Sequence, residues 1–173
     1  MIRTATPEDA AALATLAAAT FPLACPPDAR PESVQDFIAT HLTEQHFDAY
    51  LADPARLLLV AELNGVPSGY TMLVSGEPTD PDVLAALTLY PTVELSKCYV
   101  LETAHGSGLA GELMAATLEA ARGLGAAGVW LGVNNENTKA NRFYEKHGFA
   151  RVGTKKFLVG ERWEDDFVRE REL

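Results

Sequence analysis

The centre of the chain alternates between two hydrophobic patterns, and this alternation constrains the fold more than any other feature. Thr92–Leu101 and Val129–Val133 are compact apolar runs typical of strands, while Gly108–Leu124 between them carries apolar residues at helical spacing. A helix that connects two strands of one sheet leaves those strands parallel. The pattern therefore predicts a parallel central pair, followed by a further helix over Thr138–His147.

Hairpins are predicted on both sides of this centre. Arg56–Leu63 and Val66–Val74 are β-rich runs separated by Asn-Gly at 64–65, a pair that favours a tight hairpin because both turn residues adopt positive φ. Two final strands are predicted over Phe149–Val159 and Trp163–Arg171. Hairpin strands pair antiparallel, so we expect an α/β (α+β) fold with a mixed, mostly antiparallel central sheet flanked by helices.

The remaining segments surround that sheet. Ile2–Ala5 is predicted to be an edge strand, and a helix starts after Thr6. Phe21–Pro31 contains four prolines and is predicted to be a loop. Pro31–Ala52 is predicted to be helical in one or two pieces, and Gly76–Pro91 to be a connection around a short helical pattern.

Length, charge and cysteine content exclude several classes of protein. A chain of 173 residues suits one domain spanning 1–173. Its formal net charge of −10 argues against a nucleic-acid binder, which needs positive charge to displace counterions. The chain has no apolar run of membrane-spanning length and no signal-peptide pattern at its start, so we expect no membrane partner and a cytoplasmic location. Cys25 and Cys98 cannot form a disulfide framework.

A glycine-rich turn, His105-Gly-Ser-Gly-Leu-Ala-Gly111, lies between a predicted strand and a predicted helix. Glycines let the backbone adopt positive φ and approach a ligand, and a helix start presents unpaired N–H groups at the positive end of its dipole. The turn therefore predicts a site for phosphate or pyrophosphate.

Two nucleotide-binding motifs also contain a glycine-rich turn before a helix, namely GxGxxG and the P-loop. The glycines spell GxGxxG, the signature of a dinucleotide-binding oxidoreductase, but the next strand should then end in Asp or Glu and here ends in Asn134-Asn135. A P-loop is excluded because no Gly-Lys-Ser/Thr follows. A nicotinamide-dependent oxidoreductase stays the weaker alternative.

The segment from Thr92 to Phe149 resembles the GNAT superfamily of N-acetyltransferases. That family's acetyl-CoA motif, Gln/Arg-x-x-Gly-x-Gly/Ala, is matched here by His-Gly-Ser-Gly-Leu-Ala at 105–110, with His105 departing from the family's Gln or Arg. A second signature, an Asn after a strand followed by a helix ending in Phe-Tyr and then Gly-Phe, is matched over 134–149. Both motifs occur in the family's order.

The resemblance implies a binding site for acetyl-CoA as co-substrate. Backbone groups of Cys98 and Val100 would pair with the pantetheine arm, and Asn137 would contact the arm from the other side or else cap the helix at Thr138. The backbone N–H groups that would hold the pyrophosphate belong to the turn after His105: Gly106, Ser107, Gly108, Leu109, Ala110 and Gly111.

The resemblance also implies transfer of an acetyl group to a primary amine by direct attack. Tyr144 is the candidate general acid, because a phenol can supply a proton to the departing thiolate without being ionised at rest. Glu94 is the candidate general base, with a solvated strand residue as the equal alternative. Cys98 is interpreted as a buried strand residue rather than a nucleophile.

The acceptor is expected to be a small-molecule amine, with a polyamine as one candidate, while amino acids, small amine toxins and protein N-termini stay open. Four carboxylates near the final hairpin would attract a cation, although a solvated acidic turn is the favoured interpretation of Glu161, Glu164, Asp165 and Asp166. His41, His46 and His147 lack metal-ligand spacing, so no metal is expected. A non-catalytic acyl-CoA sensor is the main alternative function, and the oligomeric state stays open, a homodimer being one option.

Overall fold

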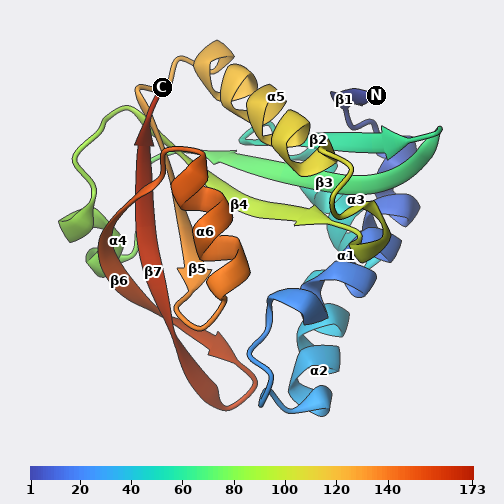
Figure 1. Cartoon of the computed structure of the whole chain (residues 1–173), viewed down its shortest axis with the longest axis horizontal. Coiled ribbons are helices and arrows are strands. Elements are labelled where there is room, and N and C mark those ends of the chain that lie inside the picture. Colours follow the sequence, from blue (N-terminus) through green and yellow to red (C-terminus); the bar gives the residue numbers. More distant parts are fainter.

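The computed structural model describes all 173 residues, and it contains a seven-stranded sheet with helices on both faces (Figure 1). The order of the strands in the sheet is β1-β2-β3-β4-β5-β7-β6. The strands are β1 (Ile2–Thr4), β2 (Arg56–Leu63), β3 (Val66–Ser75), β4 (Thr92–Val100), β5 (Gly128–Asn134), β6 (Ala150–Val159) and β7 (Arg162–Glu172). The α-helices are α1 (Ala10–Ala24), α2 (Pro31–His41), α3 (Glu44–Ala52), α4 (Pro81–Ala86), α5 (Leu109–Gly123) and α6 (Thr138–Lys146).

The predicted parallel pair is β4 and β5, and every other pairing in the sheet is antiparallel. The two strands pair only over Thr92–Glu94 and Gly128–Trp130. Beyond these residues the strands diverge, as Figure 1 shows. On β4, Ser96 has no partner on β3, and such a bulge bends the strand. The mixed sheet is thereby confirmed, and it splits into a half of β1–β4 and a half of β5–β7.

The two faces of the sheet carry separate hydrophobic clusters. Helices α5 and α6 cover one face, where Met114, Leu131 and Phe149 are buried. Helices α1 to α3 cover the other face, where Leu13 and Phe47 are buried. Side chains alternate between faces along a strand, so neighbouring residues of β3 enter different clusters, Met72 on the α1–α3 face and Leu73 on the α5–α6 face.

Most of the elements predicted from the sequence, including the two strands of the β2–β3 hairpin, end within two residues of the observed bounds. Asn64 and Gly65 have φ values of 53° and 78°, as the Asn-Gly turn predicts.

Two local expectations were wrong. The predicted loop over Phe21–Pro31 begins only after Ala24, because α1 continues through Pro22. Proline costs a backbone hydrogen bond inside a helix, but Pro22 lies in the last turn, and Phe21 is held there by stacking on Phe37 of α2 at 4.5 Å between ring centroids. Leu124, the last residue of the helix predicted over Gly108–Leu124, is 47% exposed because α5 ends at Gly123.

No helix in the structure is both long enough and apolar enough to cross a lipid bilayer.

Candidate active site

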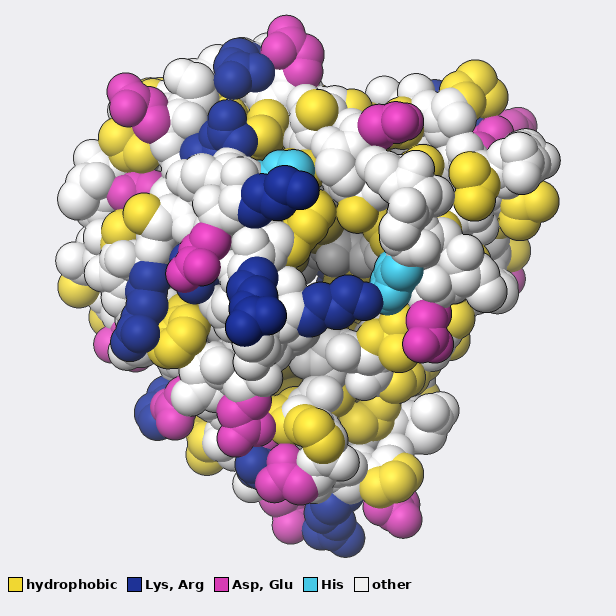
Figure 2. All heavy atoms as spheres, in the orientation of Figure 1, with side chains coloured by type: hydrophobic (Ala, Val, Ile, Leu, Met, Phe, Trp, Pro, Cys, Tyr) yellow, Lys and Arg dark blue, Asp and Glu magenta, His cyan; other side chains and the backbone are white.

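The gap between β4 and β5 contains a cavity of about 450 Å³. Its walls come from both faces of the sheet, since Tyr144 of α6 and Phe21 of α1 both line it. Figure 2 shows a hollow near the centre of one face, with basic and histidine side chains at its rim. The cavity therefore passes through the sheet and can be approached from the α5–α6 face, here called the helix face, and from the α1–α2 face, here called the loop face.

On the helix face, the glycine turn presents a row of free N–H groups. Gly106 and Gly108 have φ values of 82° and 87°, and both line the cavity together with Ala110. The N–H groups of these three residues have no hydrogen-bond partner in the protein. Such groups at the first turn of a helix favour an anion.

The alternate N–H groups of the turn are occupied. The N–H of Ser107 donates to the carbonyl of Ala104, and that of Leu109 donates to the Ser107 hydroxyl. The N–H of Gly111 donates to the carbonyl of Gly108. Of the six N–H groups in the predicted run, the structure thus leaves every second one free for a ligand.

The edge of β4 that faces the gap carries the backbone groups of Cys98 and Val100. The N–H of Leu101 donates to the carbonyl of Ser68 in β3, and the residues of an antiparallel strand direct their hydrogen bonds alternately to either side. Tyr99 therefore bonds toward β3, whereas Cys98 and Val100 direct their backbone groups toward the gap, where β5 has diverged.

His105 turns back onto the end of β4. Its Nε2 lies 3.1 Å from the carbonyl oxygen of Val100, and its Nδ1 lies 2.8 Å from Nζ of Lys139. Because an ammonium group can only donate, Nδ1 accepts and the Nε2–H donates to Val100. The Val100 carbonyl is thus already engaged, and the Val100 N–H is the group of this residue that faces the gap unpaired.

Asn137 caps α6, which is one of the two roles expected for it. Its side-chain oxygen accepts a hydrogen bond of 3.1 Å from the N–H of Ala140, and the residue also lines the cavity. Sequence reasoning missed Asn141, whose buried amide donates to the carbonyls of Asn134 and Asn137 and accepts from Arg169 of β7. This brace fixes α6, and its only sequence signal is a polar residue at an inward-facing helical position.

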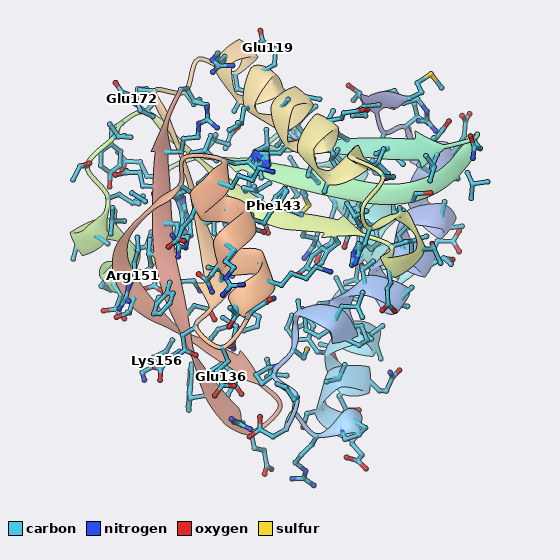
Figure 3. The ribbon with its side chains drawn as sticks, in the orientation of Figure 1. Glu119, Glu136, Phe143, Arg151, Lys156 and Glu172 are labelled. Atoms are coloured by element: carbon cyan, nitrogen blue, oxygen red, sulfur yellow. The ribbon has the colours of Figure 1, made fainter.

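Tyr144 extends from α6 to the cavity beside Cys98. Burial raises the pKa of the Tyr144 hydroxyl well above its ordinary value, and burial also raises the pKa of the Cys98 thiol to about 12. The phenol is therefore protonated at neutral pH. The thiol is protonated too, which opposes a nucleophilic role for Cys98 because the thiolate is the reactive form. Phe143, labelled in Figure 3, lines the same cavity.

Glu94 lies where β4 and β5 separate, is half-buried and lines the cavity. Burial raises the pKa of its carboxyl group, opposed by the nearby positive charges of Lys155, Lys97 and Arg56. Burial lowers the pKa of Lys97 to about 8. A carboxylate with a raised pKa has the basicity that proton abstraction needs.

The acidic residues of the final hairpin do not all face solvent, because side chains alternate between the two faces of β7. The interpretation of a solvated turn was therefore wrong for Glu164 and Asp166. Glu164 and Asp166 are each 6% exposed and line the cavity from the loop face. Glu161 and Asp165 are exposed, as expected. Glu164 is paired with Arg162 at 2.8 Å, whereas Oδ1 of Asp166 has no hydrogen-bond partner.

No group of three or more His, Cys, Asp or Glu side chains in the structure is arranged to hold a metal ion.

A sheet that splits between its two parallel strands, with a glycine turn and a helix start at the split, is the architecture of an acyl-group transferase fold. The chain belongs to the Acetyltransferase (GNAT) family, whose family model matches residues 17–149.

Curated relatives and solved structures agree with this assignment. The chain is 45% identical over 165 residues to an "uncharacterized N-acetyltransferase" of Mycobacterium tuberculosis, and the match covers 95% of this chain and 98% of the relative. PaiA N-acetyltransferase from Thermoplasma acidophilum, solved in complex with coenzyme A, superimposes with a TM-score of 0.78 at 17% identity, covering 100% of this chain and 98% of that one. YncA from Salmonella typhimurium, solved with its cofactor acetyl-CoA, superimposes with a TM-score of 0.66 at 22% identity, covering 100% and 93%. These likenesses at low identity show the shared fold.

Proposed function

We propose that the protein transfers an acetyl group from acetyl-CoA to a primary amine of a small molecule by direct attack of the amine. One observation carries the proposal: the free N–H groups of Gly106, Gly108 and Ala110 line the same cavity as a buried phenol and buried carboxylates. An anion-binding helix start and acid–base groups thereby share one enclosed space.

The helix face suits the coenzyme. The three free N–H groups at the start of α5 are complementary to a diphosphate, and the absence of side chains at Gly106 and Gly108 lets it approach the backbone. The unpaired edge of β4 at Cys98 and Val100 offers hydrogen bonds to an amide-bearing arm. When bound, acetyl-CoA supplies the acetyl group as an activated thioester. Solved relatives that contain coenzyme A or acetyl-CoA support this choice of co-substrate.

The residues around the gap supply the proton transfers. An acceptor ammonium must lose a proton before it attacks, and Glu94 is placed to accept it through water. As the N–C bond forms and the C–S bond breaks, the sulfur leaves as a thiolate, and Tyr144 is placed to protonate it. The second amine proton passes through water to the Tyr144 phenolate and restores the phenol, and Glu94 releases the first proton to solvent. Because Cys98 holds its proton, no acetyl-cysteine intermediate is required.

The proposal is tested with the purified protein, acetyl-CoA and a broad panel of primary amines. We expect calorimetry to detect acetyl-CoA binding and a thiol assay to detect release of free CoA that depends on the amine. Binding without release across the panel would overturn catalysis and favour an acyl-CoA sensor. An absence of binding would overturn both functions.

A further inference from the structure

The loop face of the cavity carries an unpaired carboxylate and an unpaired ammonium group next to each other. Oδ1 of Asp166 is enclosed, has no hydrogen-bond partner, and belongs to a side chain that lines the cavity. Lys155 of β6 lies opposite Asp166 in the β6–β7 register, yet it forms no ion pair within 4.0 Å and donates no hydrogen bond. A buried polar group without a partner is costly, so Oδ1 of Asp166 indicates a missing ligand group. Lys155 beside it is half-buried, and its ammonium group lies 5.4 Å from the centroid of the Phe157 ring.

Gly132 explains how Lys155 reaches the cavity. A Cβ atom at Gly132 would lie 2.7 Å from Cε of Lys155, so the lysine stem crosses β5 where that strand has no side chain. The ammonium group consequently extends over the sheet toward the gap instead of turning to solvent. Lys156, the next residue, points outward and pairs with exposed Asp165 (Figure 3).

The charges of the loop face balance. Glu94 and Lys97 on β4 form a second pair of opposite charges, again without a direct ion pair, while Glu164 is neutralised by Arg162. A ligand with two positive charges would therefore meet Lys97 and Lys155 without enough free carboxylates to offset them. A ligand with one positive and one negative group leaves the enclosed space close to neutral, where an unpaired charge costs most.

The rest of this face is apolar. Phe37 of α2 stacks on Phe21 and lies 5.7 Å, between ring centroids, from Phe157 of β6, and all three rings line the cavity. They form a wall beyond the charged pair. An acceptor seated here would contact carbon on one side and two opposite charges on the other.

We propose that the acceptor is a zwitterionic amino acid with an apolar side chain, whose ammonium group is held by Asp166 and whose carboxylate is held by Lys155. This inference rests on the proposed function. Both groups reach the edge of the gap at Gly132 of β5, where a Cβ atom would lie 3.3 Å from Oδ2 of Asp166 and 2.7 Å from Cε of Lys155. An acceptor held between them presents its ammonium group to Asp166 in the same cavity as Glu94, the proposed base.

The test compares each amino acid with the amine that lacks only its carboxylate. L-Phenylalanine is paired with phenethylamine and L-leucine with 3-methylbutylamine, and spermidine serves as a polycation. We expect kcat/KM for thiol release to favour each amino acid over its amine by about tenfold or more, as for one buried charge-assisted contact. A preference for the amines or for spermidine overturns the inference.

Variants separate the two contacts. Lys155→Met keeps the stem but removes the charge, so the ratio of kcat/KM between the members of each pair should fall from about tenfold to about one. Asp166→Asn should lower the rates with both members of each pair. Lys156→Met is the matched control and should retain the preference. An unchanged preference in Lys155→Met also overturns the inference, and thermal melts of each variant exclude misfolding.

The inference can fail separately from the proposed function. Thiol release with simple amines but not with amino acids contradicts only the zwitterionic acceptor. An absence of release with every amine, together with an absence of acetyl-CoA binding, contradicts the proposed function and the acceptor assignment with it.

Discussion

Individual residues in the cavity titrate away from their ordinary ranges because they are buried. Burial raises the pKa of Asp166 to about 6, partly offset by the charge of Lys155, and it raises the pKa of Tyr144 well above the usual phenol value. Burial thus shifts both groups toward their neutral forms, and at neutral pH Tyr144 is protonated whereas Asp166 is still mostly ionised. Each shift gives a measurable consequence.

Asp166 should make stability depend on pH. A carboxyl whose folded pKa is raised stabilises the fold while it is protonated, and this contribution is lost as pH rises from about 4 through about 6. Asp166→Asn mimics the neutral form, so its free energy of unfolding should rise relative to wild type by roughly 1–3 kcal/mol across that interval. Denaturant titrations from pH 4 to pH 7 measure the difference. Asp165→Asn, at an exposed neighbour, should show no such rise.

Tyr144→Phe removes the phenolic proton and little else. A positioned general acid contributes about 100-fold or more, so turnover should fall by that factor while affinity for CoA stays within about twofold. Steady-state kinetics and calorimetry separate the two effects. Unchanged turnover would remove Tyr144 from the chemistry and leave it as a packing residue against Phe149.

Among the elements, α5 offers a matched pair of glycines. Gly108 precedes the first residue of α5 and has a φ of 87°, and Gly125 follows the last turn and has a φ of 79°. A Cβ atom added at either position would meet nothing within 4 Å. Gly108→Ala and Gly125→Ala should therefore cost similar stability, about 1 kcal/mol. Only Gly108→Ala should weaken acetyl-CoA binding, measured by calorimetry. Equal affinities in the two variants would separate the glycine turn from the ligand.

Helix α6 is held to the sheet by its buried amide. Asn141→Ala removes one acceptor of Arg169, a side chain only 3% exposed, and takes the side-chain donor away from the carbonyls of Asn134 and Asn137. The free energy of unfolding should fall by about 2–4 kcal/mol. Chemical denaturation measures the loss, and exposed Asn135→Ala is the control, with a change under about 0.5 kcal/mol.

Sequence patterns predicted elements well where local signals decide the structure, and less well where contacts between distant segments decide it. The Asn64-Gly65 turn and the parallel pair follow from turn chemistry and from the order of elements. The extension of α1 through Pro22 depends on packing against α2. Glu164 and Asp166 looked like a solvated turn because the alternation of β7 hides them only once α1 and α2 cover that face. No local sequence pattern predicts that the side chain of Lys155 crosses β5 at Gly132.

At the scale of the whole molecule, two half-sheets meet along three residue pairs of β4 and β5. A ligand that contacts both halves should bind only the folded state and so stabilise it. Acetyl-CoA at about 100 times its Kd should add about 2.7 kcal/mol and raise Tm by about 5–10 °C for a chain of this size. NADPH at the same concentration should leave Tm unchanged in a thermal-shift assay. The reverse outcome would restore the nicotinamide alternative.

The two openings of the cavity, on the helix face and on the loop face, are formed by different parts of the polypeptide. The glycine turn and Tyr144 belong to the central strand–helix–strand–helix segment, whereas the charged pair and aromatic wall come from the opening helices and the closing hairpin. Substitutions near either end of the chain can consequently change which acceptors the protein uses, while the residues proposed to bind acetyl-CoA stay unchanged. A new acceptor preference then requires the replacement of only a few side chains in the β6–β7 hairpin, and the proposed catalytic residues need not change.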